Sequence, residues 1–198
     1  MSYFNIVTES SESTVVAEYT PVEKNATSYQ SEAQLEAEFI RLLTEQGYEY
    51  LQIHSEDELL RNLRVQLEKL NSYTFSNSEW KRFFGDFIAN ANEGYAEKAR
   101  KLQEDPRYSL SLDAGGTKNI TLIDKKNIHN NSVQVINQYE VSRSDGAVHD
   151  NRYDVTILVN GLPIVHIELK RRGVAIREAF NQINRYQRES FSAGRGLF

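Results

Sequence analysis

Two carboxylates and a lysine lie on two successive strand-like segments near the end of the 198-residue chain. Asp154 is close to the start of the first segment, and Glu168 and Lys170 end the second. The dipeptide Asn160-Gly161 between the segments is a strong signal for a β-hairpin. Because directly opposite residues in antiparallel strands have Cβ atoms about 4.5–5.5 Å apart, we expect the hairpin to bring the three charged side chains together.

The alternation of side chains along the hairpin predicts its register. The odd-numbered positions form an apolar core face: Tyr153, Val155, Ile157, Val159, Val165, Ile167 and Leu169. A regular two-residue loop would pair Val159 with Leu162 and mix the two faces. We therefore expect an odd-length loop, or a two-residue loop with one bulge. Pairing Val159 with Pro163 then places Asp154 opposite Glu168.

Two carboxylates at this separation repel one another unless a cation lies between them. Lys170 can supply part of that charge, and a divalent ion that prefers oxygen ligands, such as Mg²⁺, can supply more. The alternative is an exposed ladder of charges on a sheet, with Lys170 as an ion-pair partner. The wholly apolar odd-numbered face favours a cation site over this alternative.

A helix is expected over 174–191, directly after these residues. Gln182 and Tyr186 are four residues apart and share one face of that helix. This helix and the residues just before it contain arginines that can bind phosphates through paired hydrogen bonds: Arg171, Arg172, Arg177, Arg185 and Arg188. The alternatives are a solubilising role for the arginines and a boundary position between core and solvent for Tyr186.

Charge is distributed unevenly along the chain. The net charge is −5 at pH 7, yet residues 170–198 carry seven basic and two acidic side chains. A basic end on an acidic body often contacts nucleic acid, although a solvated helix has the same pattern. The absence of cysteine excludes a disulfide scaffold and a thiolate site. Without a signal peptide or an apolar run of about 18 residues, we expect a cytoplasmic protein with no membrane contact.

The chain divides into an N-terminal arm, residues 1–30, and a domain over residues 31–198. The arm is polar, with one expected strand near 15–19. The helical part of the domain, 31–105, contains four expected helices: after Ser31, after Ser55, over 79–89 and over 95–103. The sheet part, 106–198, contains five expected strands: 108–112, 119–124, 133–141, 153–159 and 162–169. A polar loop is expected over 142–151. This order predicts an α/β or α+β fold.

Taken together, the motifs resemble a nuclease family. Asp154, Glu168-Leu169-Lys170 and Gln182-x-x-x-Tyr186 are similar to the PD-(D/E)xK nuclease signature with the Gln-x-x-x-Tyr motif of its RecB-like branch. The chain resembles more closely the R (restriction) subunit of type I restriction–modification enzymes. The similar stretches are 28–50, 78–80, 122–127, 151–163, 168–170 and 173–183. Tyr153 departs from the signature, which usually has a proline before the first aspartate.

The resemblance implies a restriction-endonuclease-like core, with a central mixed sheet flanked by helices. It implies an endonuclease domain of a larger subunit, which also has an ATP-driven helicase-like motor. Such a subunit cleaves double-stranded DNA after translocation and works with modification and specificity subunits. We expect ATP only in the motor domains outside this chain, because the chain lacks a Gly-x4-Gly-Lys-[Ser/Thr] phosphate loop. The family fold usually continues with another strand, so we expect a C-terminally truncated domain that can be inactive alone.

The resemblance also implies roles for individual residues. The catalytic set is Asp154, Glu168, Lys170, Gln182 and Tyr186. Asp154, Glu168 and the carbonyl oxygen of Leu169 would hold Mg²⁺, and Lys170 would orient a water molecule or stabilise charge in the transition state. The five arginines would contact DNA phosphates.

The sequence does not assign a single role to the remaining acids and histidines near these motifs. Glu32 and Glu36 lie four residues apart on the first helix and can reach the metal face, although capping and solubility are equally good explanations. His149, Asp150 and His166 receive no role. Two other functions stay open: a different PD-(D/E)xK repair nuclease or resolvase, and a non-catalytic DNA-binding or assembly domain.

Overall fold

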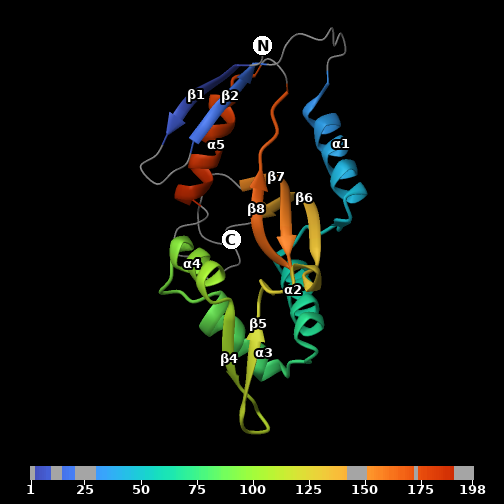
Figure 1. Cartoon of the computed structure of the whole chain (residues 1–198), viewed down its shortest axis with the longest axis vertical. Helices are drawn as coiled ribbons and strands as arrows, with labels where there is room; N and C mark the ends of the chain where they lie inside the picture. The colour runs from blue at the N-terminus through green and yellow to red at the C-terminus, as the bar shows by residue number, and fades with distance from the viewer. Residues whose placement is uncertain (1–2, 10–14, 21–29, 142–150, 172–173, 190–198) are drawn as a thin grey trace.

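The computed structural model describes residues 3–9, 15–20, 30–141, 151–171 and 174–189, and the molecule is elongated (Figure 1). Its helices are α1 (Glu32–Glu45), α2 (Glu56–Asn71), α3 (Asn77–Phe83), α4 (Tyr95–Glu104) and α5 (Ile176–Glu189), with a π-helical turn η1 (Phe84–Ile88) and a 3₁₀ turn η2 (Ile128–Asn130). Its strands are β1 (Tyr3–Glu9), β2 (Val15–Thr20), β3 (Glu49–Tyr50), β4 (Arg107–Ser111), β5 (Thr117–Thr121), β6 (Val133–Val141), β7 (Asn151–Val159) and β8 (Leu162–Ile167).

A four-stranded sheet with the order β3-β6-β7-β8 lies at the middle of the molecule (Figure 1). β3 runs parallel to β6, and the other neighbouring strands are antiparallel. The expected central mixed sheet is thus confirmed. β3 was not expected, because a strand of two residues has no recognisable alternation. The expected loop falls largely on residues 142–150, which lie outside the described residues.

Helices α1 and α2 cover opposite faces of the central sheet. Val135 packs with Leu43 of α1, whereas the next strand residue, Ile136, packs with Leu59 of α2. Successive side chains of a strand point to opposite faces, so the two helices lie on the two sides of the sheet. The even-numbered face of β7 is therefore also core, and Leu158 on that face is fully buried.

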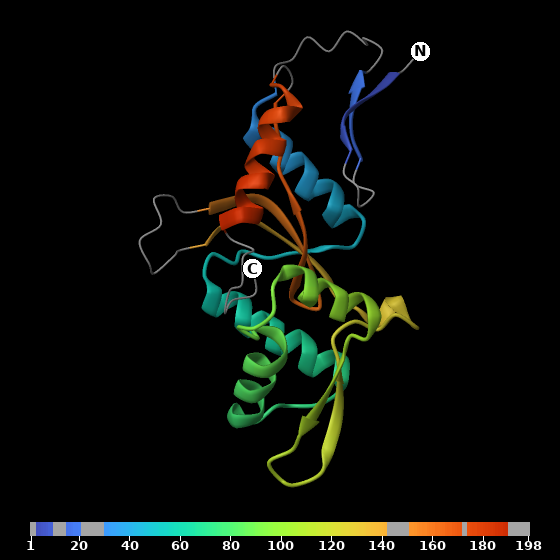
Figure 2. The same ribbon diagram turned by 90° about the vertical axis from the view of Figure 1, so that its left-hand side faces the viewer.

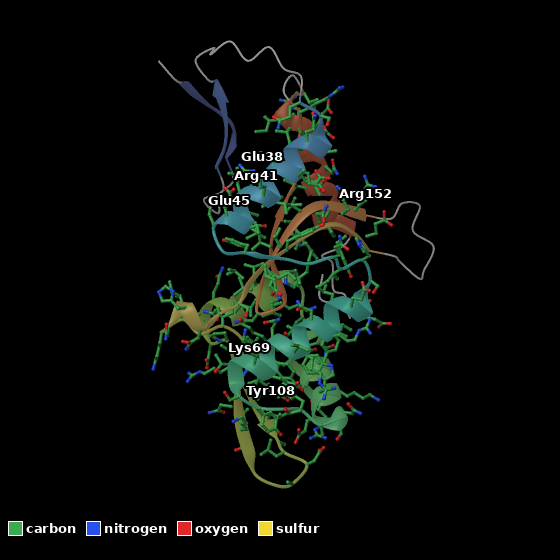
Figure 3. All side chains as sticks on the ribbon, turned by 90° about the vertical axis from the view of Figure 1, so that its right-hand side faces the viewer. Glu38, Arg41, Glu45, Lys69, Tyr108 and Arg152 are labelled. Atoms are coloured by element: carbon green, nitrogen blue, oxygen red, sulfur yellow. The ribbon has the colours of Figure 1, made fainter. Side chains whose placement is uncertain are left out.

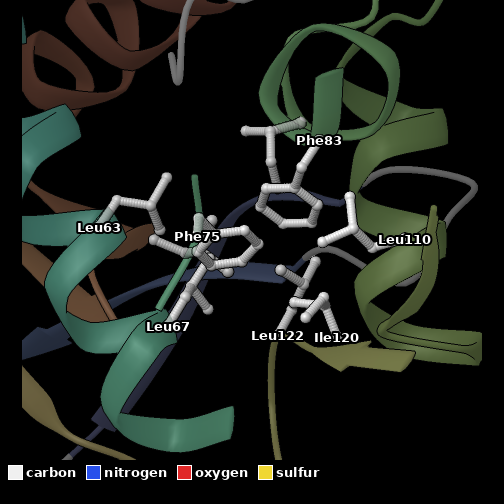
Figure 4. Close-up of a cluster of buried hydrophobic side chains, with 9 residues drawn as sticks. Leu63, Leu67, Phe75, Phe83, Leu110, Ile120 and Leu122 are labelled. Carbon is white, nitrogen blue, oxygen red and sulfur yellow. The ribbon is translucent and has the colours of Figure 1, made fainter. Parts of the chain in front are cut away.

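Helix α2 also contributes to a second core, below the sheet in Figure 1. The buried members of this second core come from α2, the segment that joins it to α3, α3, η1, the β4–β5 hairpin with the residue after it, and β8 (Figure 4): Leu63, Leu67, Phe75, Phe83, Ile88, Leu110, Ile120, Leu122 and Leu162. Phe75 and Phe83 are stacked, with ring centroids 5.4 Å apart. Because Leu162 is the first residue of β8, the turn of the β7–β8 hairpin is attached to the second core.

The first turn of α1 is fixed by the capping box that the sequence predicts. The backbone N–H of Gln34 donates to the hydroxyl of Ser31, and the N–H of Ser31 donates to the Gln34 side chain. Glu38, Arg41 and Glu45 form an exposed ladder on the outer side of this helix (Figure 3). Glu32 and Glu36, in the capped half of the helix, make contacts with the sheet part of the domain instead, described below.

The β7–β8 hairpin contains the bulge that the sequence predicts, although not at its turn. Val159 pairs with Leu162 around the two-residue loop, and the register shifts at Ile157, which pairs with Val165. The expected pairing of Val159 with Pro163 is wrong, because the extra residue lies within β8 rather than in the loop. Val165, expected in the core, is 42% exposed.

Gly161 in this turn packs directly against α2. Its φ angle is 80°, and a Cβ atom on it would lie 2.6 Å from the Cα atom of Leu63. Only glycine tolerates both the left-handed conformation and so close an approach to another backbone. The turn is therefore fixed to α2 by backbone packing.

The alternation of side chains breaks near the middle of the sheet. Tyr139 and Tyr153, paired across β6 and β7, pack in the α2 cluster with Ile136. Regular alternation would place both tyrosines on the α1 face with Val155. Gln138, which precedes Tyr139, has a φ angle of 52°. The expectation that Tyr153 shares the core face of Val155 is therefore wrong, because the strands kink at this step.

The N-terminal arm forms an antiparallel hairpin of β1 and β2 at the end of the molecule where α1 and α5 lie (Figure 1). The sequence predicts the second of these strands but not the first. Among the described helices, none combines the length and apolar character that a membrane span requires.

Candidate active site

Asp154 lies at the open end of the β7–β8 hairpin, away from the turn. The last paired residues there are Val155 and Ile167, so the same register places Asp154 opposite Glu168, one step further along. The Oδ2 atom of Asp154 accepts a hydrogen bond of 2.9 Å from the backbone N–H of Leu169. This bond holds the carboxylate against the segment that carries Glu168.

The Glu168 side chain is almost completely removed from solvent, with 2% of its surface exposed. The ammonium group of Lys170 lies 3.9 Å from Oε2 of Glu168, and the Lys170 side chain is 20% exposed. A dehydrated carboxylate is costly unless cations or hydrogen-bond donors compensate for the lost hydration. The expected ion pair between these two residues is therefore present, in a buried setting rather than on a solvated ladder.

The segment after β8 rises between α1 and α5 in both Figure 1 and Figure 2. From α1, Oε1 of Glu32 accepts a hydrogen bond of 3.4 Å from the backbone N–H of Arg171. One turn later, Oε1 of Glu36 accepts a hydrogen bond of 2.5 Å from the side chain of Asn137, and its Oε2 atom accepts one from Gln138. Glu32 and Glu36 thus contact the two segments that flank Asp154.

His166 lies on β8, two residues before Glu168. Its ring stacks on Tyr153 with centroids 4.5 Å apart, and its Nδ1 atom is 2.9 Å from the hydroxyl of Thr156. Burial lowers the pKa of His166 to about 4, so the ring is neutral at pH 7. These contacts indicate a packing role for His166.

The C-terminal helix α5 includes Gln182 and Tyr186, the two positions of the expected Gln-x-x-x-Tyr motif. The structure describes the side chains of two of the five expected arginines. Arg171 and Arg177 have exposed side chains, whereas Arg172 lies outside the described residues. For Tyr186, Arg185 and Arg188 the structure describes only the helical backbone. His149 and Asp150 also lie outside the described residues.

The oxygen atoms at the open end of the hairpin fit a cation that retains water. Two carboxylates, Asp154 and Glu168, flank the backbone of Leu169, whose carbonyl oxygen is a third candidate donor. No group of three or more histidine, aspartate or glutamate side chains in the described ranges is placed to hold a metal. Two carboxylates with a backbone carbonyl are hard oxygen donors, the type that binds divalent cations such as Mg²⁺ or Ca²⁺.

Sequence reasoning did not find the polar residues of β6 beside this site. The hydroxyl of Tyr50 donates to Oδ1 of Asn137, and Asn137 donates in turn to Glu36. Gln138 lies between the pairs Asn137–Val155 and Tyr139–Tyr153, which places it opposite Asp154. No local pattern marks Asn137 or Gln138, because Glu36, which binds both, lies about 100 residues earlier in the chain.

Comparisons with known proteins identify the family of the chain. The family model that describes the N terminus of the type I restriction enzyme R protein matches residues 29–198. This chain belongs to that family, which confirms the resemblance drawn from the motifs.

Individual relatives support the assignment. The chain is 49% identical over 193 residues to the type I restriction enzyme EcoprrI endonuclease subunit of Escherichia coli. The aligned region covers 97% of this chain and 60% of that protein. It is 39% identical over 175 residues to the type I restriction enzyme SsaAORF53P endonuclease subunit of Staphylococcus saprophyticus. Here the aligned region covers 86% of this chain but 18% of that protein. An archaeal relative, the putative type I restriction enzyme MjaVIIIP endonuclease subunit of Methanocaldococcus jannaschii, is 30% identical over 151 residues. The chain therefore corresponds to a part of its relatives.

Proposed function

We propose that this chain is the Mg²⁺-dependent DNA endonuclease domain of a type I restriction enzyme R subunit. The observation that carries the proposal is the convergence at the open end of the β7–β8 hairpin, where the Asp154 carboxylate is bonded to Leu169 and the buried Glu168 pairs with Lys170. The relatives described above are endonuclease subunits of type I restriction enzymes, which supports the same activity.

Asp154, Glu168 and the carbonyl oxygen of Leu169 hold Mg²⁺ in this proposal. When bound, the ion polarises the scissile phosphate and lowers the pKa of a water molecule that it binds. Asp154 is oriented for this role by the N–H of Leu169, which leaves its second carboxylate oxygen available. Lys170 orients the attacking water or stabilises negative charge in the transition state.

The other residues bind and orient DNA. Gln182 and Tyr186, one turn apart on α5, support the site and contact the DNA backbone. The arginines of the 171–188 segment bind phosphates, so DNA affinity should fall as salt concentration rises: Arg171, Arg172, Arg177, Arg185 and Arg188. Glu32 and Glu36 hold the surrounding segments from α1.

The complete protein works in an assembly. We infer that double-stranded DNA is the substrate and that modification and specificity subunits are partners. Motor domains outside this chain bind ATP and drive translocation before cleavage. Such an enzyme acts on DNA in the cytoplasm of a bacterium or archaeon.

The test is cleavage of supercoiled DNA by the complete enzyme with Mg²⁺ and ATP. Asp154→Ala and Lys170→Ala should each abolish cleavage and leave ATP-driven translocation unchanged, because both residues belong to the nuclease site alone. Lys69→Ala, which removes an exposed lysine from α2, is the matched control and should cleave normally. Normal cleavage by either site variant would refute the assignment of Asp154 and Lys170 to the nuclease site.

Loss of translocation together with cleavage would point to a different function. It would favour a DNA-binding or assembly domain without catalysis. Measuring DNA binding of the two site variants separates these cases, since a nuclease variant should still bind DNA.

A further inference from the structure

Gln138 has a positive φ angle, which is unusual for a residue inside a β-strand. Three residues other than glycine have a positive φ angle in the described part of the chain: Ser72, Gln138 and Asn160. Ser72 ends α2 as its C-cap, and Asn160 starts the β7–β8 turn; both are places where this conformation is common. Gln138 lies inside β6, where such strain persists only if surrounding contacts enforce it, and often for a functional reason.

Glu36 of α1 enforces this conformation. Asn137 and Gln138 are consecutive and would point to opposite faces in a regular strand, yet both side chains donate to the carboxylate of Glu36. The Asn137 side chain is fixed from its other end by the hydroxyl of Tyr50. The kink in β6 is therefore held by hydrogen bonds from a helix packed on the sheet.

The same contacts fix the direction of the Gln138 amide. A carboxylate oxygen accepts hydrogen bonds, so the group that faces Glu36 must be the NH₂ group of Gln138. The amide oxygen, Oε1, then points elsewhere. It is buried and has no hydrogen-bond partner in the part of the chain that the structure describes. A buried acceptor without a donor is costly, and a cation or water is the usual partner.

Extending the β6–β7 and β7–β8 registers to the open end places Gln138 opposite Asp154 and Asp154 opposite Glu168. We propose that Oε1 of Gln138 is a further oxygen ligand of the divalent cation at Asp154 and Glu168, and that Glu36 positions it. The proposal rests on the proposed nuclease site. An amide oxygen adds a hard ligand without adding a third negative charge to two carboxylates that already repel. The carboxylate of Glu36 acts through Gln138 and is a positioning group.

The test is calorimetric titration of the complete endonuclease subunit with Mg²⁺, without ATP or DNA. Gln138→Met keeps the length of the side chain and removes the amide oxygen, and it should raise the Mg²⁺ dissociation constant about tenfold or more. Asp154→Ala should abolish the same binding event and thereby identify it among cations bound elsewhere in the subunit.

Gln66→Met is the matched control. Gln66 on α2 also has a buried Oε1 atom without a described partner, and its NH₂ group donates to Asn62, outside the site residues. This variant should leave the Mg²⁺ dissociation constant unchanged. Equal weakening by Gln66→Met and Gln138→Met would overturn the proposal, because loss of any buried amide would then explain the effect.

A second variant guards against misfolding at the kink. Asparagine adopts positive φ angles readily, so Gln138→Asn keeps the backbone conformation while its shorter amide cannot reach both Glu36 and the cation. It should weaken Mg²⁺ binding as Gln138→Met does. For the positioning role, Glu36→Ala should weaken binding similarly, and Glu36→Gln, which keeps one acceptor oxygen for two amide donors, should recover only part of it.

The outcomes separate this proposal from the function on which it rests. If Asp154→Ala loses Mg²⁺ binding while both Gln138 variants bind as the wild type does, the role of Gln138 is refuted and the nuclease site stands. If Asp154→Ala binds Mg²⁺ as the wild type does, the nuclease site itself is refuted and the role of Gln138 with it.

Discussion

The two ends of the β7–β8 hairpin are built in different ways. At the turn, the backbone of Gly161 touches α2, and Asn160 makes side-chain hydrogen bonds of 2.8 Å to Leu122, Asn131 and Ser132. At the open end, a charged carboxylate is bonded to one backbone N–H, and a buried glutamate faces a lysine. Every polar group of the Asn160 side chain is used for the fold, whereas the open end keeps charges close together at an energetic cost.

This difference teaches where the fold is determined and where chemistry can be placed. The turn end is stabilised by close backbone packing and by hydrogen bonds that satisfy the Asn160 side chain. The open end contains features that lower stability. They are two neighbouring carboxylates, the strained backbone of Gln138 and the buried side-chain amide oxygen of the same residue. Proteins retain such costs mainly at functional sites. Substitutions at the turn should therefore affect stability, and substitutions at the open end should affect activity.

The largest effect on stability is expected from Gly161→Ala. A methyl group there would meet the Cα atom of Leu63, and the φ angle of 80° adds strain, so we expect a loss of about 4 kcal/mol. Gly116→Ala is the control, because its φ angle is 86° but no atom lies within 4 Å of the added carbon. Its cost should be about 1–2 kcal/mol. Equal losses in urea-induced unfolding would contradict close packing of the turn.

Asn160→Ala should cost somewhat less, about 3 kcal/mol. It leaves the carbonyl of Leu122 and the N–H of Ser132 without their side-chain partner, and each buried group costs about 1–3 kcal/mol. Urea-induced unfolding of the chain measures this loss. DNA cleavage by folded Asn160→Ala enzyme should remain normal below its melting temperature; a selective loss of cleavage would show that the turn contributes to chemistry.

A pH-dependent effect of intermediate size is expected from His166. Its pKa is about 4 in the folded chain and near 6.5 when unfolded, so the unfolded state binds more protons between these values. Stability should therefore fall as pH decreases from 6.5 to 4, by about 2 kcal/mol at pH 5. His166→Gln should remove this part of the acid sensitivity. An unchanged slope of stability against pH in the variant would argue against burial of a neutral ring.

The smallest effect on stability is expected from Asp154→Asn. The amide oxygen can still accept the hydrogen bond from Leu169, and repulsion with Glu168 is relieved, so stability should change by less than about 1 kcal/mol. Cleavage should nevertheless be lost. Urea-induced unfolding and a cleavage assay of the same variant measure the two effects. A strongly destabilised Asp154→Asn variant would contradict the difference between the two ends of the hairpin.

Local signals in the sequence predicted most helices and strands correctly. Ser31 and Ser55 begin helices because their side chains cap the first turn, a contact within four residues. The bulge in the β7–β8 hairpin followed from the alternation of apolar side chains, but its position did not, because it depends on Leu162 entering the second core. β3 and the π-helical turn after α3 have no local signal and arise from packing.

The candidate site was predictable only in part. Asp154, Glu168 and Lys170 follow from the hairpin pattern, since their placement needs only the register of two adjacent strands. Gln138 does not, because its conformation is set by Glu36 across the sheet–helix contact. The prediction of which side chains share a face was wrong at Tyr153 for the same reason, because an alternating pattern gives no sign of the kink at Gln138.

Helix α2 is shared by two cores, with Leu59 in the cluster against the sheet and Leu63 and Leu67 in the second core. A helix common to two cores couples their melting, because neither core can lose it and remain intact. Heating should therefore give one cooperative transition for both cores rather than two. Native-state hydrogen exchange of the α2 amides should then report the global unfolding free energy, and a proline in the middle of α2 should unfold the sheet together with the β4–β5 hairpin.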